Sequence, residues 1–130
     1  MPGMDDTRTD KFGSKAAPIA LRIVNGPRAG EVLNLPSPAA VIGRNDPPEI
    51  SVDIDLTDAE LSETPMTSRR HARIEQDLTT GETFLTDLGS TNGTWINDLR
   101  LAPKMRSSAL TVPSQIRFAN LEIETIHVNA

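Results

Sequence analysis

The chain has 130 residues, a formal net charge of −5 at pH 7 and no cysteine. This length suits one domain with a core of its own, and the missing cysteines exclude disulfides and thiolate metal sites. The acidic balance argues against non-specific binding of nucleic acid, which requires a basic face. No apolar run is long enough to cross a bilayer, and the polar residues 1–15 are not a secretory signal. We therefore expect a monomer in the cytoplasm that binds neither nucleic acid nor membrane.

The predicted elements begin after a polar stretch. Residues 1–17 contain almost nothing apolar and predict a flexible tail, so the folded domain is expected over 18–130. From there, short segments rich in apolar residues alternate with turn signals such as Asn25-Gly26-Pro27. The strands expected in chain order cover residues 19–24, 31–35, 39–42, 54–56, 71–76, 83–88, 95–96, 99–101, 115–118 and 121–128.

These short strands predict an all-β sandwich, because no segment keeps a helical period over several turns. The one helical turn expected lies at 58–61, inside a loop-rich region that runs from 45 to 66. Seven acidic side chains and no basic one lie between Asp46 and Glu63. They lack the carboxylate spacing and the central glycine of a calcium loop, so this acidic run is predicted to be solvated loop.

Three polar clusters lie in predicted loops at strand ends. They are Gly43-Arg44, Ser68-Arg69-Arg70-His71, and the segment from Asp87 to Thr94, which contains Gly89-Ser90-Thr91-Asn92-Gly93. Loops at one end of a sandwich gather in space. Arginine presents a planar fork of donors that suits phosphate, serine and threonine add hydroxyl donors, and an asparagine amide pairs with both groups of a peptide backbone. The clusters therefore predict a binding site for a phosphate that is attached to a chain.

The order of these motifs resembles the forkhead-associated (FHA) domain family. Gly-Arg comes first, then Ser-x-x-His, then Ser-Thr-Asn-Gly-Thr with an asparagine three residues later, and the resemblance covers residues 20–127. It implies a β-sandwich of about eleven short strands with the binding loops at one end, which recognises phosphothreonine in partner proteins without a cofactor or metal. Two features depart from the family pattern: the long acidic stretch between Arg44 and Ser68, and residues 111–114 in place of a small acidic turn.

The resemblance assigns five residues to the ligand. Arg44 would bind the phosphate through its guanidinium, and Ser68 would donate its hydroxyl to the same phosphate. Arg69 lies where the family often contacts the phosphate or the ligand backbone. Thr91 would donate through its hydroxyl or its main chain, and Asn92 would hold the ligand main chain beside the phosphothreonine.

Four further residues are expected to support the site without touching the ligand. They are Gly43, His71, Gly93 and Asn97. His71 would brace the loops that present Ser68 and Thr91. Because neighbours on a strand alternate in direction, one of Arg69 and Arg70 should point outward, and we expect this to be Arg70.

Two other classes of function compete with this interpretation. A nucleotide-binding enzyme would need a lysine and a helix after its phosphate-binding loop, whereas residues 89–94 contain no lysine and lead into a predicted strand. We therefore expect no enzyme activity. A phospho-independent docking domain on the same fold is the stronger alternative, and the intact set Arg44, Ser68, Thr91 and Asn92 argues against it. The expected partner is a Ser/Thr protein kinase or its phosphorylated substrate.

The tail carries two threonines among acidic residues, Thr7 and Thr9. Some bacterial FHA proteins have a tail threonine that a kinase phosphorylates and that then folds back into its own site. By this resemblance, a phosphorylated Thr7 or Thr9 would occupy the site around Arg44 and Ser68. An ordinary leader without such a role is the alternative.

Overall fold

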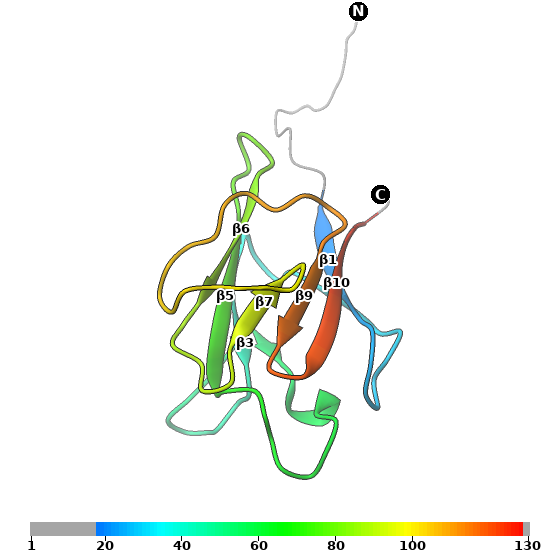
Figure 1. The fold of residues 1–130 in the computed structure, drawn as a ribbon, viewed down its shortest axis with the longest axis vertical. Coiled ribbons are helices and arrows are strands. Elements are labelled where there is room, and N and C mark those ends of the chain that lie inside the picture. The colour runs from blue at the N-terminus through cyan, green and yellow to red at the C-terminus, as the bar shows by residue number, and fades with distance from the viewer. Residues whose placement is uncertain (1–17, 129–130) are drawn as a thin grey trace, which may run out of the picture.

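Two β-sheets pack face to face in the computed structural model, which describes residues 18–128 (Figure 1). The strands of these residues are β1 (Ile19–Ile23), β2 (Val32–Asn34), β3 (Ala39–Gly43), β4 (Ile54–Asp55), β5 (Arg70–Gln76), β6 (Thr83–Asp87), β7 (Thr94–Ile96), β8 (Leu99–Arg100), β9 (Gln115–Phe118) and β10 (Leu121–His127). The only helix among them is a 3-10 turn, η1 (Thr57–Ala59). The predicted all-β sandwich is confirmed, and every expected strand is present within two residues at either end.

The strands divide into a six-stranded sheet, in the order β2-β1-β10-β9-β7-β8, and a four-stranded sheet, in the order β4-β3-β5-β6. All pairs are antiparallel except β3 with β4. The expected hairpin of the first two strands forms, with Leu21 opposite Leu33. In the second sheet β5 lies between β3 and β6, so the strand that carries the Ser-x-x-His motif is held on both sides.

The core lies between the two sheets. Every second residue of a strand faces the opposite sheet, and most of the inward positions are apolar, as with Ile116 and Phe118 on β9 and Ile74 on β5. Seventeen apolar residues are buried within residues 18–128, most of them on strands. The frame that carries the loops is therefore closely packed, and this rigidity fixes the strand ends at which the polar clusters begin.

The structure has ten strands among the described residues, one fewer than the resemblance implied. The long segment between β8 and β9 follows the edge of β6, where Lys104, Ser107 and Leu110 donate backbone N–H groups to the carbonyls of Asp87, Leu85 and Thr83, each at 2.8 Å. Successive donors are therefore three residues apart in the segment, whereas successive acceptors are two residues apart in β6. The segment covers the sheet edge, but this mismatch prevents a regular ladder.

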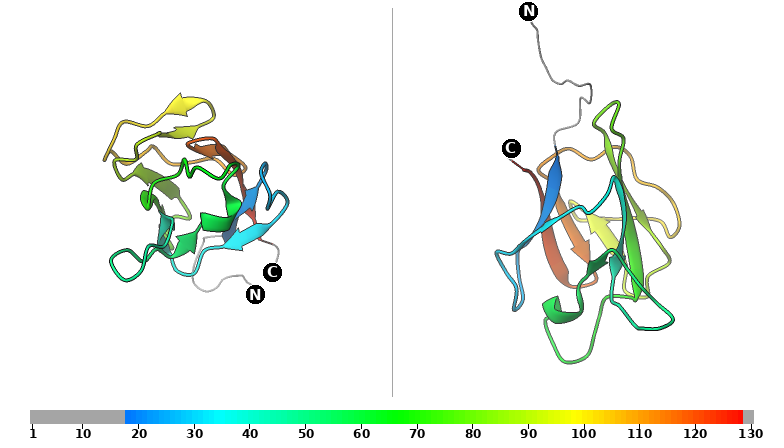
Figure 2. Two further views of the ribbon diagram at one scale, coloured as in Figure 1. Left: turned by 90° about the horizontal axis from the view of Figure 1, so that it is seen from below. Right: turned by 180° about the vertical axis from the view of Figure 1, so that it is seen from behind.

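The two ends of the sandwich differ in what they carry. The loops after β3, before β5 and between β6 and β7 gather at the lower end of Figure 1, and the view from behind in Figure 2 places them at the same end. The start of β1 and the end of β10 lie at the upper end, where Val128 N–H donates to Pro18 O at 2.9 Å. Thr7 and Thr9 lie outside the described residues. No helix within residues 18–128 is long and apolar enough to span a membrane.

Candidate functional site

The three polar clusters meet at the lower end of the sandwich around one surface hollow of about 420 Å³. It is called the site hollow below. Its lining consists of Arg44, Ile50, Pro65, Met66, Thr67, Ser68, Arg69, Arg70, Thr91 and Asn92. Three arginines and three hydroxyl side chains face this space and no carboxylate lines it, so the hollow suits an anion.

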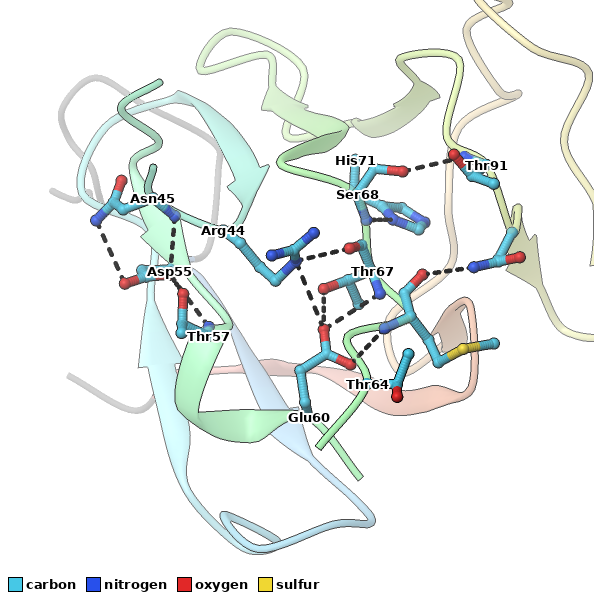
Figure 3. A network of polar contacts seen from close by, with 12 residues as sticks. Arg44, Asn45, Asp55, Thr57, Glu60, Thr64, Thr67, Ser68, His71 and Thr91 are labelled. Atoms are coloured by element: carbon cyan, nitrogen blue, oxygen red, sulfur yellow. Dashed lines mark hydrogen bonds and ion pairs between the residues drawn. The ribbon is translucent and has the colours of Figure 1, made fainter. Parts of the chain in front are cut away.

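Arg44 enters the hollow directly after β3. Its backbone N–H donates to Arg69 O at 3.0 Å, which fixes the strand end, and its Nε donates to Thr67 O at 2.7 Å. Within residues 18–128 the two Nη groups bond to no other group, and a quarter of the side chain is exposed. Figure 3 shows the guanidinium held from one side in this way. Arg44 can therefore direct its terminal donors at a bound anion.

A hydrogen bond joins Ser68 and Thr91 and determines which of their donors are left for a ligand. Thr91 N–H donates to Ser68 Oγ at 3.0 Å (Figure 3). Because the serine oxygen accepts this bond, its own O–H is left to donate elsewhere. The main-chain N–H of Thr91 is already used, so of the two modes expected for this residue only the hydroxyl remains for a ligand. Both hydroxyls lie beside the site hollow.

His71 lies buried beneath these loops and connects them. Its Nδ1 accepts from Ser68 N–H at 2.9 Å, and its Nε2 lies 2.8 Å from Gly93 O, to which it donates as the neutral tautomer. The ring also packs edge-on against Phe118, with 5.5 Å between centroids. Burial lowers the pKa of His71, so the ring stays neutral and keeps one acceptor and one donor nitrogen.

The amide of Asn92 already makes one hydrogen bond within the protein. Its Nδ2 donates to Met66 O at 2.9 Å, so its Oδ1 is the group left for the backbone N–H of a ligand. Gly93 follows with a φ of +92°, which favours glycine. Asn97 exchanges bonds with Gln115 of β9: its N–H donates to the carbonyl at 2.8 Å and its Oδ1 accepts the N–H at 2.9 Å. Asn97 therefore joins the turn between β7 and β8 to β9, and it does not line the hollow.

Gly43 allows β3 and β5 to approach each other. The register between these strands shifts at Ile42 and Gly43, and an added Cβ at Gly43 would lie 2.0 Å from Arg69 O. No side chain fits there, because this distance is far inside van der Waals contact. The close approach lets Arg44 N–H reach Arg69 O and thereby joins the first two clusters.

Arg70 alone was expected to point outward, but Arg69 and Arg70 do not differ in this way. Both side chains are exposed, and both line the site hollow. Arg69 lies in the turn before β5 rather than on the strand, so the alternation of strand neighbours does not apply to this pair. Arg69 Nη1 donates to Asp46 Oδ2 at 2.8 Å across two half-exposed side chains, an ion pair that contributes little in water. A ligand can therefore bind Arg69 in place of Asp46 at a small cost in free energy.

Comparison with known proteins identifies the family. The model of the FHA domain matches residues 40–119, which is more than half of the chain. The chain belongs to the FHA domain family. No curated protein sequence matches it. The match contains all the residues of the site hollow.

Solved FHA domains have the same fold. The FHA domain of a hypothetical protein of Arabidopsis thaliana is 28% identical, with a TM-score of 0.70 over 95% of this chain and 96% of that chain. A structure from an analysis of phosphothreonine-dependent FHA domain interactions is 26% identical, with a TM-score of 0.63 over 87% and 99% of the two chains. The FhaA FHA domain, complexed with the intracellular domain of Rv3910, is 27% identical, with a TM-score of 0.59 over 82% and 98%.

In this FHA domain the third loop is organised by Asp87, a buried residue for which the sequence predicted no role. Its carboxylate accepts from the N–H groups of Gly89 and Ser90 at 3.0 and 3.2 Å, from the Ser90 hydroxyl, and from Thr94 Oγ1 at 2.7 Å. Burial by itself raises the pKa of Asp87, but these hydrogen bonds outweigh it and hold the pKa below its ordinary value. The charged form therefore fixes the turn that presents Thr91.

The acidic run between Asp46 and Glu63 is mostly exposed, as predicted, and only Glu60 contradicts the prediction of solvated loop. Two of the exposed members still make specific hydrogen bonds. Asp53 accepts from Val41 N–H at 2.8 Å, and Asp55 accepts from Asn45 and Thr57. Burial opposes ionisation of Asp55, yet these bonds lower its pKa. The Asp-x-Thr spacing at 55–57 is a turn signal that the sequence offered.

Glu60 turns inward, with only 6% of its side chain exposed. It accepts from Met66 N–H at 2.8 Å, from Thr67 N–H at 3.1 Å and from the Thr67 hydroxyl. Its Oε2 lies 3.9 Å from Arg44 Nε (Figure 3). No sequence pattern indicated these contacts, because the six and seven residues that separate Glu60 from its partners follow no strand or helix period.

Proposed function

We propose that this FHA domain is a phosphothreonine-binding adaptor that recognises partner proteins phosphorylated by a Ser/Thr kinase. One observation carries the proposal: the free Nη groups of Arg44 and the hydroxyls of Ser68 and Thr91 face one hollow that no carboxylate lines. Charge-assisted bonds of this kind are the strong ones in phosphate recognition. The FHA domain named for phosphothreonine-dependent interactions, which is 26% identical, supports the same function.

The partner is proposed to be the kinase itself or one of its substrates, bound as an extended segment. Oδ1 of Asn92 is directed to the ligand backbone, since Nδ2 is engaged by Met66 O. We propose no enzyme activity for this module, which acts as a monomer in the cytoplasm. The cysteine-free composition fits a reducing compartment.

The test is a titration with three degenerate peptide libraries that carry phosphothreonine, phosphoserine or threonine at a fixed central position. Trp95 is the only tryptophan and the chain has no tyrosine. An added Cβ at Gly93 would lie 2.8 Å from its ring, so its fluorescence reports on the site loop. We expect the phosphothreonine library to bind, and phosphoserine to bind at least about fourfold more weakly, since one methyl is lost. Equal binding of the unphosphorylated library would favour the phospho-independent docking alternative.

A variant of Arg44 tests whether the peptide binds in the site hollow. Arg44→Lys keeps the charge but loses the fork, and we expect about ten- to a hundredfold weaker binding of the phosphothreonine library. The matched control is Arg22→Ala, which removes a positive charge from the outer face of the six-stranded sheet and should bind normally. Normal binding by Arg44→Lys would contradict the site assignment.

A further inference from the structure

The segment Met66–Thr67 has no regular backbone partner and is held entirely by side chains. Met66 N–H and Thr67 N–H both donate to Glu60, at 2.8 and 3.1 Å. Met66 O accepts from Asn92 Nδ2 at 2.9 Å, and Thr67 O accepts from Arg44 Nε at 2.7 Å. Four consecutive polar groups of the backbone are therefore bound by three side chains, of which Arg44 and Asn92 are assigned to the ligand.

Glu60 supplies the acceptor for both N–H groups of this segment. A carboxylate offers about four acceptor positions, and here three are filled by Met66 N–H, Thr67 N–H and the Thr67 hydroxyl. A buried carboxylate is stable only when it is hydrogen-bonded or paired. Glu60 meets this condition with its side chain 6% exposed. The carboxylate and the segment therefore hold each other in one arrangement.

The contact with Glu60 directs Met66 O and anchors Thr67. Thr67 N–H and Met66 O belong to one planar peptide unit and point in opposite directions, so the bond from Thr67 N–H to Glu60 aims Met66 O at Asn92. Thr67 O belongs to the next peptide unit. Glu60 holds Thr67 through both its N–H and its hydroxyl, which keeps the carbonyl of this residue beside Arg44 Nε. Each carbonyl takes one donor of a ligand-binding side chain, which leaves the other donors or acceptors of that side chain aimed at the hollow.

We propose that Glu60 is a positioning residue of the phosphopeptide site, which orients Arg44 and Asn92 through the Met66–Thr67 segment without touching the ligand. This inference rests on the proposed function of the site hollow. A positioning role and simple electrostatics predict opposite effects of removing Glu60 on phosphate binding. Glu60 is an acid 3.9 Å from Arg44 Nε, so by charge alone its removal should strengthen the binding of a phosphate. A positioning role requires the removal to weaken binding.

The deciding variant is Glu60→Gln, which keeps the shape but replaces one acceptor oxygen with a donor. We expect about tenfold weaker binding of the phosphothreonine library, a change of about 1.4 kcal/mol. The matched control is Glu63→Gln, since Glu63 is an exposed acid of the same loop. It should bind as well as the unaltered chain or slightly better. Unchanged or tighter binding by a folded Glu60→Gln variant would overturn the proposal.

Two further measurements separate positioning from general destabilisation. In an Arg44→Ala background, Glu60→Gln should weaken binding of the phosphothreonine library by less than about threefold. The reason is that substitutions of residues that act through one another do not have additive effects. A full tenfold loss there would overturn the proposal. If Glu60→Gln does not fold, Thr67→Val removes only the hydroxyl donor to Glu60 and should weaken binding about threefold, whereas normal binding would overturn the proposal.

Hydrogen exchange distinguishes a failure of this inference from a failure of the proposed function. The amide protons of Met66 and Thr67 and the Nε proton of Arg44 should exchange slowly in the free protein and faster in Glu60→Gln. This holds even if no phosphothreonine peptide binds. Unchanged exchange in a folded Glu60→Gln variant would exclude the positioning role, whatever the ligand is.

Discussion

His71 shows how one buried side chain can organise two ligand-binding loops. It accepts from Ser68 N–H on one side and donates to Gly93 O on the other. Only the neutral ring can do both, because protonation would turn Nδ1 into a second donor facing the serine N–H. The low pKa that burial imposes on His71 therefore serves the geometry of the site.

This arrangement predicts a pH dependence of stability. The pKa of His71 is lower in the folded than in the unfolded chain, so below the ordinary histidine pKa of about 6.5 the unfolded state binds the additional proton. The free energy of unfolding should fall as the pH falls below about 6.5, with a slope that approaches about 1.4 kcal/mol per pH unit. Urea denaturation between pH 7.5 and 5.5 measures it.

The control for this prediction is the second histidine, His127, which is exposed at the end of β10. His127→Asn should keep the pH dependence. Asp55 and Asp87 also have lowered pKa values, but the stability that they contribute is lost only below the ordinary carboxyl range. Loss of the slope in His127→Asn, or a flat profile in the unaltered chain, would contradict the assignment to His71.

The pairing of β3 with β5 decides how the first two clusters meet. At Gly43 the strands are so close that an added Cβ would lie 2.0 Å from Arg69 O. The neighbouring residue, Arg44, uses this proximity for its backbone bond to the same carbonyl. A larger residue at Gly43 must separate the strands and so move Arg44 and Ser68 apart.

Gly43→Ala should therefore lower the free energy of unfolding by about 2–4 kcal/mol, because the clash is with backbone that has no room to move. The comparison is Gly30→Ala. At Gly30 an added Cβ meets nothing within 4 Å, but φ is +94°, so only a backbone cost of about 1–2 kcal/mol is expected. Chemical denaturation of both variants tests the difference, and an equal or smaller loss at Gly43 would contradict the role of close approach.

The strands could be predicted from the sequence because their signals are local. Alternation and turn residues located β1 and β5 to within about one residue, and the order of the motifs indicated that Arg44, Ser68 and Thr91 would lie together. Contacts made by single side chains over irregular loops have no such signal. The inward turn of Glu60 and the irregular cover of β6 depend on packing across the whole fold. Composition therefore suggested solvated loop for Glu60, and the sequence predicted no element for the segment that covers β6.

The described part of the molecule has a site end and an opposite end, at which residues 18 and 128 lie. The described chain begins at Pro18, whose carbonyl accepts from Val128 N–H. This end of the sandwich is opposite the loops that line the site hollow (Figure 1). Strand β5 runs from Arg70 at the hollow to Gln76 near the other end, and its six steps span about 20 Å. Thr9 precedes Pro18 by nine residues, which reach at most about 32 Å when fully extended, and the eleven residues from Thr7 reach at most about 40 Å.

These lengths permit a phosphorylated tail to reach its own hollow. The span of about 20 Å along β5 is shorter than the reach of about 32 Å from Thr9, so the tether is long enough for closure within one copy. The hollow of a second copy is the alternative target, and it sets no limit on the length of the tail. Closure within one copy therefore stays the prediction for a phosphorylated Thr9.

Sedimentation of the chain carrying phosphothreonine at position 9 tests this. We expect a monomer at every protein concentration, with weakened affinity for external phosphothreonine peptides, because the bound tail occupies the hollow. An average mass that rises with protein concentration, and that Arg44→Lys returns to the monomer value, would instead show association between copies. A monomer with unchanged external affinity would show that phosphorylated Thr9 does not reach any hollow, and would leave the tail outside the function of this domain.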